Sequence, residues 1–464
     1  MDQLNILDQK ILNVLQNHTL EPYSKQAERL GISPQTMIRR VESLKKREIL
    51  RFPIASFIPE RLSLSRYGVM FSISSLHQFT LLQNALSEHK YIRAYNRFYG
   101  ENFGIYAHFD LPPNTEAIFT KYLEYLLNEE YCDNYFIMKS MGYRLSQPEP
   151  PKSYTSEPEK FDVIKFWEKR LNKSTKLPRL PSAIDTNLIE PLHFMLLRDL
   201  TTSVRNGITI DIRSKQTDLV KHYRDYYESL AKKIKLTDAE EASLYNLSAF
   251  FDTKNMPKNG NGKTIVSDAA KVEFGRKYYS LVFNNLITNP RWNFSRKLSE
   301  QHVTRAYFIE NIPEQEKAQL FRFLNEEKIP FQTAFELFDK GIFLRLSMPP
   351  YYDSKINYLI WSSFKDYKIY SLDFFGKHGL YWTFEFDSYD WAKKGWRTDD
   401  EWMYESVIDK INDKLSNGTF GNYKKDQEAY LRKHIATNGN GNSNGNGVTA
   451  TTTQPPPEVT IRGS

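Results

Sequence analysis

Apolar residues recur at intervals of three and four near the amino terminus, which is the spacing of one helix face. Residues 34–46 form the clearer of two such stretches. Its apolar positions are Met37, Ile38, Val41 and Leu44, and all four are expected to face inward. Ser33 suits the N-cap of this helix and Pro34 its first turn, while Gly31 suits the left-handed position that ends the helix before it. The pattern predicts two helices joined by a tight turn.

The opposite face of the 34–46 helix carries amide, hydroxyl and guanidinium groups. Such groups pair with base edges in a major groove, and neighbouring lysines suit phosphates. A helix at 8–17 and a basic strand at 49–52 complete a winged helix-turn-helix within residues 1–62. A merely solvated basic face is the alternative, which these neighbouring elements disfavour. The side chains expected at DNA are Ser33, Gln35, Thr36, Arg39, Arg40, Lys45, Lys46, Arg47 and Arg51.

Residues 63–146 alternate between strand and helix patterns in the order β-α-β-β-α-β. We expect strands at 67–73, 91–98, 105–111 and 135–141, and helices at 79–89 and 116–128. Pro112 and Pro113 end the third strand. This order is typical of a split βαβ, or ferredoxin-like, domain.

Residues 4–60 resemble the DNA-binding half of the Lrp/AsnC, or feast/famine, transcription regulators. The matching segments are LDQKIL at 7–12, AERLGIS at 27–33 and RRV at 39–41, with Leu44 and Ile49. Residues 67–144 resemble the effector-sensing and dimerising half of the same family. The resemblance implies a sequence-specific regulator that binds double-stranded DNA, with a small-molecule effector and a homodimer as further expectations. It places the effector site at the turn of Gly100, Glu101, Asn102 and Phe103.

The sequence also matches itself at an offset of 237 positions. Gly104 then falls on Gly341, Pro112-Pro113 on Pro349-Pro350, and Gly142 on Gly379. We therefore expect an α+β chain in which the winged helix-turn-helix plus ferredoxin-like unit occurs twice. The second unit would comprise a degenerate winged helix at 237–300 and a ferredoxin-like domain at 301–425.

The second winged helix is expected to read DNA less well than the first. Gly275 lies inside the counterpart of the 34–46 helix, where glycine costs about 1 kcal/mol relative to alanine. Arg276, Lys277 and Arg291 keep this region basic and are a candidate second DNA contact. Contact with phosphates and a purely structural role both remain open.

Composition adds limits to this picture. The 464 residues carry a formal net charge of +7 with a pI near 9.0, which suits a nucleic-acid partner without requiring one. Cys132 is the single cysteine, so an internal disulfide is excluded and a cysteine-based zinc site is implausible. No apolar run approaches the roughly 18 residues of a membrane span, and we expect no membrane partner and a cytoplasmic protein.

Three further segments have distinct compositions. Residues 147–160 are rich in proline and charge and are expected to form a linker. Residues 161–236 are expected to form a mainly helical connector. Residues 437–464 are rich in glycine, asparagine and proline and are expected to be a disordered tail.

Signals for catalysis are weak. Gly262-Lys263-Thr264 imitates the end of a phosphate-binding loop, but Pro257 stands where that loop needs glycine. The histidines fall in no metal-ligand spacing. We expect no catalytic residue, metal or cofactor, and no enzymatic activity.

Two alternatives to a regulator remain. One is a partner-binding protein with a vestigial DNA-binding domain. The other is an enzyme similar to the sirohaem decarboxylases, which look like fused Lrp/AsnC units and carry histidines beside arginine on their second strand. The matching stretch here, YIRAYNRF at 91–98, has arginines but no histidine.

Overall fold

The computed structural model describes most of the first 146 residues and much of residues 303–417. The described ranges are 5–19, 21–54, 57–100, 103–146, 162–177, 179–185, 291–294, 303–327, 332–380, 388–390 and 393–417, with residues 189, 193, 194, 197 and 286. The chain divides into two compact units, Met1–Asn412 and Asp413–Ser464. The expected linker at 147–160, most of the connector at 161–236, most of the unit at 237–300 and the tail at 437–464 lie outside the described residues.

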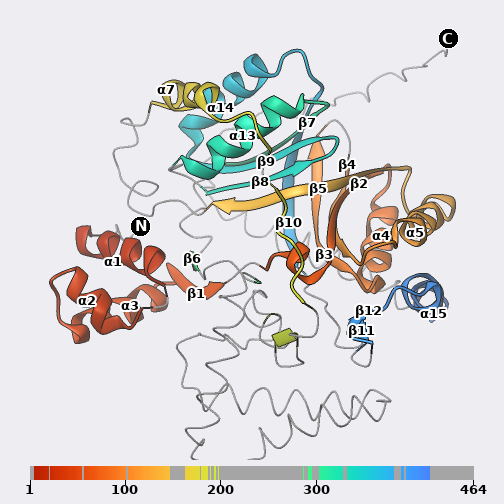
Figure 1. Cartoon of the computed structure of the whole chain (residues 1–464), viewed down its shortest axis with the longest axis horizontal. Helices are drawn as coiled ribbons and strands as arrows, with labels where there is room; N and C mark the ends of the chain where they lie inside the picture. Colours follow the sequence, from red (N-terminus) through yellow and green to blue (C-terminus); the bar gives the residue numbers. More distant parts are fainter. Residues whose placement is uncertain are drawn as a thin grey trace, which may run out of the picture. The chain divides into compact units, whose positions relative to one another are not determined.

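Three helices at the amino terminus form a small bundle, coloured red in Figure 1. They are α1 (Ile6–Asn17), α2 (Tyr23–Arg29) and α3 (Pro34–Lys46). Ser33 caps α3 as expected, because its Oγ accepts a hydrogen bond from the backbone N–H of Thr36 at 3.1 Å. Gly31 has φ +65°, the left-handed conformation that glycine adopts without strain. The tight turn between α2 and α3 is therefore the one that the sequence predicted.

The buried face of α3 is narrower than the sequence suggested. Met37, Val41 and Leu44 are fully buried in the core of the bundle. Ile38 was expected beside them, but its side chain is 46% exposed. At 3.6 residues per turn the three buried residues share an arc of about 60°, and Ile38 lies about 60° beyond it. The prediction for Ile38 was wrong because Ile38 is spaced three residues from Val41, and such a spacing does not distinguish the buried arc from a position about 60° beyond it.

A strand from far along the chain completes this bundle. β1 (Leu50–Ile54) pairs in antiparallel fashion with β6 (Arg291–Phe294), with Pro53 opposite Trp292. Trp292 is fully buried among the core residues of α1 to α3, and its backbone N–H donates to Oε1 of Gln16 at 3.1 Å. The amino-terminal helices therefore depend on a residue more than 240 positions away in the sequence.

Two stretches of chain then show the same order of elements, β-α-β-β-α-β. The first follows the short helix η1 (Pro59–Leu62) and contains β2 (Ser65–Ile73), α4 (Leu76–Glu88), β3 (Ile92–Gly100), β4 (Phe103–Leu111), α5 (Glu116–Asn128) and β5 (Asn134–Ser146). The second contains β7 (Val303–Glu310), α13 (Glu314–Glu326), β8 (Gln332–Phe338), β9 (Gly341–Met348), α14 (Pro350–Ser363) and β10 (Ile369–Leu380). The expected strands and helices of residues 63–146 are confirmed to within a few residues at their ends.

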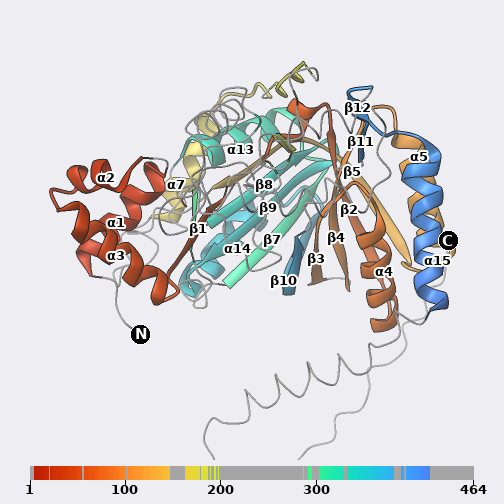
Figure 2. The ribbon, with the colours of Figure 1, turned by 90° about the horizontal axis from the view of Figure 1, so that it is seen from below.

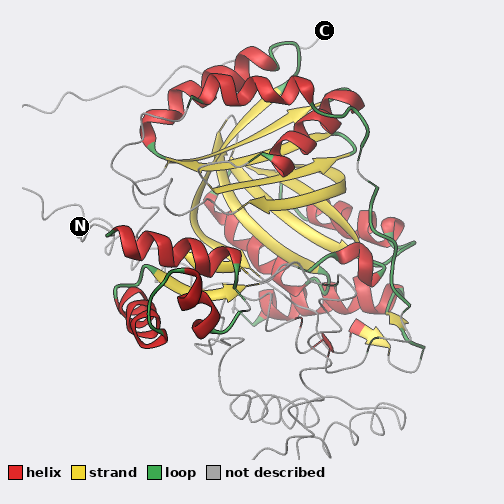
Figure 3. Cartoon of the chain, turned by 60° about the vertical axis from the view of Figure 1, so that its left-hand side comes forward, coloured by secondary structure: helices red, strands yellow, loops and turns green. Residues whose placement is uncertain are grey.

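The strands of both stretches form one closed barrel in the order β10-β3-β4-β2-β5-β8-β9-β7. Two antiparallel seams close it: β5 pairs with β8, and β10 pairs with β3. Figure 3 shows the curved strands with helices packed outside them. The sequence analysis expected two ferredoxin-like units without specifying how their strands meet, and the structure joins the strands of both stretches edge to edge.

Aromatic side chains fill the inside of the barrel. The cluster there is Phe98, Tyr106, Met138, Ala306, Phe308, Phe338, Phe343 and Leu372. Tyr106 of β4 stacks on Phe343 of β9, with ring centroids 4.6 Å apart. Gly68 leaves room for Phe338, since a Cβ at Gly68 would lie 2.8 Å from Cζ of Phe338. An eight-stranded barrel is just wide enough for its own side chains to fill, as they do here.

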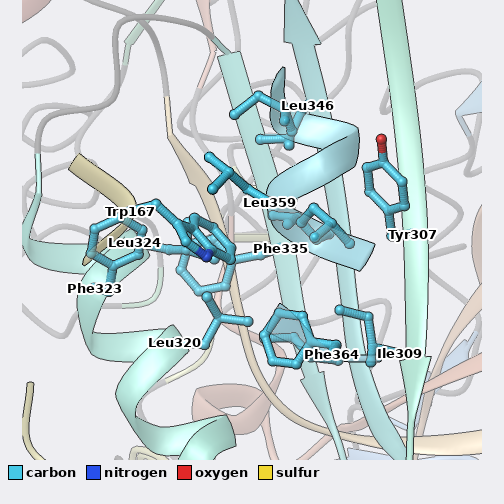
Figure 4. Close-up of a cluster of buried hydrophobic side chains, with 14 of the residues drawn as sticks. Trp167, Tyr307, Ile309, Leu320, Phe323, Leu324, Phe335, Leu346, Leu359 and Phe364 are labelled. Carbon is cyan, nitrogen blue, oxygen red and sulfur yellow. The ribbon is translucent and has the colours of Figure 1, made fainter. Parts of the chain in front are cut away.

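Helices cover the outside of the barrel. α13 and α14 pack on β7, β8 and β9, and the helix α7 (Val163–Glu168) joins their core through Trp167 (Figure 4). Trp167 Nε1 donates to Oγ of Ser363 at 2.8 Å. Thus α7 and the following η3 (Lys169–Asn172), which the sequence assigned to the connector, pack with the second stretch.

The last described elements include a segment around Asp400 and Tyr404 that contacts α5. They are β11 (Tyr389–Asp390), β12 (Gly395–Trp396), the π-helix η6 (Glu401–Glu405) and α15 (Ser406–Ser416). Figure 2 shows α5 and α15 on the same side of the strands. Lys121 of α5 pairs with Asp400 at 2.8 Å, and its Nζ lies 3.9 Å from the ring centroid of Tyr404.

Replacing Trp292 with alanine should destabilise α1 to α3. Removing a fully buried tryptophan costs about 3–5 kcal/mol. Hydrogen exchange of the backbone amides in α1, α2 and α3 measures the loss directly. Trp361→Ala is the matched control, because Trp361 is 46% exposed and its removal should change stability by less than about 0.5 kcal/mol. Unchanged protection of α1 to α3 in the Trp292 variant would contradict the packing described.

Candidate functional site

One face of α3 is exposed along the whole helix. Beyond Ser33 and Pro34, the exposed side chains of this face are Gln35, Ile38, Arg39, Glu42 and Lys46, which we call the α3 stripe. At 3.6 residues per turn these five positions fall within an arc of about 100°. The stripe combines an amide, a guanidinium, an ammonium, a carboxylate and one aliphatic side chain. Each of these groups has a partner among the base edges or phosphates of DNA.

Two of the expected DNA-contacting arginines bind within the protein. Arg40 and Arg47 point toward Asp8 of α1, whose side chain is 3% exposed. Nη1 of Arg40 lies 3.4 Å from Oδ1 of Asp8, and Nη1 of Arg47 lies 3.3 Å from Oδ2. The pair neutralises a buried carboxylate and ties α3 to α1. Arg39, in contrast, is exposed and has no ion pair with any described residue.

The remaining predicted side chains of α3 lie at its two ends. The hydroxyls of Ser33 and Thr36 are hydrogen-bonded to each other at 2.9 Å as part of the N-terminal cap. Lys45 pairs with Glu42 at 3.3 Å, and its Nζ lies 5.9 Å from the ring centroid of Trp292. Lys46 is exposed. The side chains of Arg51 and Arg291, and all of Arg276 and Lys277, lie outside what the structure describes.

Gly100, the first residue of the turn that the resemblance assigned to an effector, lies at a seam of the barrel. Gly100 is opposite Leu372 in the pairing of β3 with β10. A Cβ at Gly100 would lie 2.2 Å from the backbone oxygen of Ser371, so a side chain there would force the seam apart. Phe103 begins β4 and is 60% exposed. Glu101 and Asn102 lie outside the described residues.

A buried ionic cluster was missed by the sequence analysis. His108 of β4 and Glu336 of β8 meet inside the barrel, with Nε2 of His108 2.7 Å from Oε2 of Glu336. The hydroxyl of Tyr106 lies 2.9 Å from the same nitrogen and 3.4 Å from the same oxygen. The side chain of Glu336 is 1% exposed, and that of His108 is 15% exposed. The cluster links the two stretches of chain across the barrel.

Further charges surround this cluster. Arg66 of β2 makes two hydrogen bonds to Asp110 of β4, at 2.8 and 3.1 Å, and both residues are buried. Burial acts to raise the pKa of Glu336, but the neighbouring His108 and Arg66 outweigh burial and hold that pKa below its usual value. Burial raises the pKa of Glu60 of η1. The neighbouring cations therefore favour the ionised form of Glu336, in contrast to Glu60.

The sequence contained only a faint signal for the cluster. His108 and Glu336 are 228 positions apart, so no local spacing connects them. Each is a polar residue inside an apolar strand, in FGIYAHFDL and QTAFELF respectively. Such a residue usually has a buried partner, but the sequence does not show which strand provides it.

The described residues contain no metal-binding group and no membrane-spanning helix. Among the described residues, no group of three or more His, Cys, Asp or Glu side chains is placed to hold a metal ion. Within the same part of the chain, none of the helices is long and apolar enough to cross a membrane.

Comparison with known proteins identifies the amino-terminal helices. A family profile described as the AsnC-type helix-turn-helix domain matches residues 4–45. The chain thus contains an AsnC-type helix-turn-helix domain, which implies DNA binding. No curated protein sequence matches the chain at a significant level.

Solved structures of two kinds are similar to this chain. Escherichia coli AsnC is 16% identical and covers 30% of this chain and 93% of its own, with a TM-score of 0.25. A Neisseria meningitidis transcriptional regulator solved with L-Met is 18% identical and covers 30% and 91%, with a TM-score of 0.26. The siroheme decarboxylase NirDL is 13% identical and covers 87% and 99%, with a TM-score of 0.43.

The last of these comparisons corrects one expectation. The sequence analysis excluded enzymatic activity, but the similarity that extends over 87% of the chain is to an enzyme. The expectation rested on local patterns: an incomplete phosphate-binding loop, histidines in no metal-ligand spacing and no histidine on the second strand. Local patterns do not reveal contacts between distant residues, such as that of His108 with Glu336.

Replacing Glu336 with glutamine should reduce the acid sensitivity of the protein. A carboxylate whose folded-state pKa is lowered stabilises the fold above its unfolded pKa, near 4.3, and loses that contribution as pH falls through the folded value. We expect Glu336→Gln to cost about 1–3 kcal/mol at pH 7 and to flatten the decline below pH 4.5. Urea denaturation at pH 7, 5, 4 and 3 measures both the cost and the decline. Glu124→Gln, on an exposed carboxylate of α5, is the control. Parallel pH curves for wild type and Glu336→Gln would contradict the assignment.

Proposed function

We propose that this chain is a sequence-specific DNA-binding transcription regulator of Lrp/AsnC type. The observation that carries the proposal is the α3 stripe on an AsnC-type helix-turn-helix domain. Met37, Val41 and Leu44 hold the helix on the bundle, while Gln35 and Arg39 point to solvent from the opposite side. Arginine pairs bidentately with guanine and glutamine with adenine in a major groove. Of the expected DNA contacts, we retain Gln35, Arg39 and Lys46 as the leading candidates.

We further propose that the two β-α-β-β-α-β stretches are repeats of one ferredoxin-like unit that pair about an internal two-fold axis. Ile54 lies opposite Arg291, its own counterpart at the 237-residue offset, as a two-fold axis through that pair requires. The two seams agree with this symmetry. Phe98 and Phe338 occupy equivalent positions, because they lie opposite Gly104 and Gly341, which correspond at the 237-residue offset. Each of the two phenylalanines also lies in a seam. There Phe98 is opposite Phe374, and Phe338 is opposite Ser140.

On this proposal one chain supplies internally what two chains supply in a dimer. The second winged helix at 237–300 would then contribute β6 to the first bundle, with Arg276, Lys277 and Arg291 as its candidate DNA contacts. A homodimer of such chains would read a symmetric DNA site. The effector proposal stays with the turn at Gly100 to Phe103, because Gly100 lies at the seam between β3 and β10.

Replacing Arg39 with alanine should weaken specific DNA binding by about 1–3 kcal/mol without changing the free energy of unfolding. Arg40→Ala is the matched comparison. It should mainly destabilise the bundle, by about 1–3 kcal/mol, because the buried Asp8 loses one of its two cations. Anisotropy titration with a duplex selected from a random pool measures binding, and thermal denaturation measures stability. An Arg40 variant of normal stability that loses more affinity than the Arg39 variant would overturn this ranking.

A second candidate function is enzymatic, of the sirohaem-decarboxylase kind. The observation that favours it is the contact of Tyr106, His108 and Glu336, since a histidine bonded to a carboxylate can accept and donate a proton.

Incubating the purified protein with sirohaem tests this function. Binding should appear as a change in the absorption spectrum, and decarboxylation as a loss of carboxyl groups from the tetrapyrrole by mass spectrometry. His108→Ala should abolish the reaction. Absence of sirohaem binding, together with an unchanged mass of the tetrapyrrole, would exclude this enzymatic function.

A further inference from the structure

One aliphatic side chain lies within the polar α3 stripe. Ile38 is 46% exposed and does not belong to the core of the bundle formed by Met37, Val41 and Leu44. Its neighbours along the helix surface are Gln35 at i−3 and Glu42 at i+4, with Arg39 next in sequence. An isolated exposed apolar residue needs no explanation on an ordinary surface. Here, however, the surface around it consists of groups that suit base edges.

The charges of the stripe indicate which part of DNA it faces. Glu42 is 54% exposed at the middle of the stripe. Its carboxylate pairs with Lys45, which lies outside the stripe, and would repel a phosphate that faced the stripe directly. A carboxylate in such a position is compatible with a base edge, since it can accept from the amino group of cytosine. The middle of the stripe, which includes Ile38, therefore suits the floor of the groove and not the sugar-phosphate backbone. Lys46, at the far end, suits the backbone.

We propose that Ile38 is a specificity residue that contacts the 5-methyl group of a thymine in the major groove. The methyl group is the only apolar feature of a base edge there, and it distinguishes thymine from the other bases. Ile38 lies about 100° around the helix from Arg39 and one turn from Gln35, so the thymine lies beside the bases read by those two residues. This inference rests on the proposed function and names part of the DNA sequence that the same site recognises.

Selection of DNA from a random duplex pool tests the inference on the full-length protein. Wild type, Ile38→Ala and Ile6→Ala are compared, and Ile6→Ala is the control because Ile6 is 72% exposed on α1. Both variants should keep the wild-type unfolding midpoint, since neither side chain is buried. The wild-type and Ile6→Ala consensus should contain a thymine whose preference disappears in Ile38→Ala, while the other positions stay unchanged.

Substitution of deoxyuridine for that thymine removes only the methyl group. Wild type should lose about fourfold in affinity, the value of one buried methyl-sized group, whereas Ile38→Ala should bind both duplexes equally. An equal response of the two proteins, or an unchanged consensus in Ile38→Ala, overturns the inference and leaves the proposed function intact. A wild-type protein that selects no sequence overturns both.

Discussion

The antiparallel seams between β5 and β8 and between β10 and β3 are the interactions on which the rest of the described structure depends. A four-stranded sheet left open would present two edges of unpaired N–H and C=O groups, which invite pairing with other chains. Closing the barrel satisfies these groups within one chain and creates an interior that neither stretch has alone. Phe98 and Phe338 lie in the seams and also in the aromatic cluster, so the hydrogen bonding and the interior packing stabilise each other.

Closure also explains how the barrel can tolerate charge. His108 and Glu336 come from opposite stretches, and each would be costly to bury alone. Removal of either partner leaves a buried polar group without its main contact, which makes the correct pairing of the two stretches the favoured one. The pairing of β1 with β6 also favours one arrangement of the chain, because Trp292 is buried only when β6 brings it into the core of α1 to α3. The helix-turn-helix domain therefore requires a strand that directly precedes the second stretch.

Local structure was predictable from sequence, whereas contacts between distant segments were not. The cap at Ser33, the left-handed Gly31 and the bounds of α5 follow from residues within a few positions of one another. The barrel, the ribbon and the ionic cluster depend on pairs separated by more than 180 positions, for which a single sequence gives no partner. Ile38 was misplaced for a different reason: spacing alone located the buried face of α3 with an error of about 60°.

The cations of α3 illustrate why a count of basic residues overstates the capacity to bind DNA. Sequence alone gives Arg39, Arg40 and Arg47 the same chemistry, but Asp8 makes them unequal. A carboxylate that is 3% exposed requires compensation, and Arg40 and Arg47 provide it from the flank of the helix. Arg39 lies on the exposed face and pairs with no carboxylate in the part of the chain that the structure describes. On the proposed function its guanidinium can pair with a base without loss of a contact to any described residue, and Ile38 lies on the same exposed face.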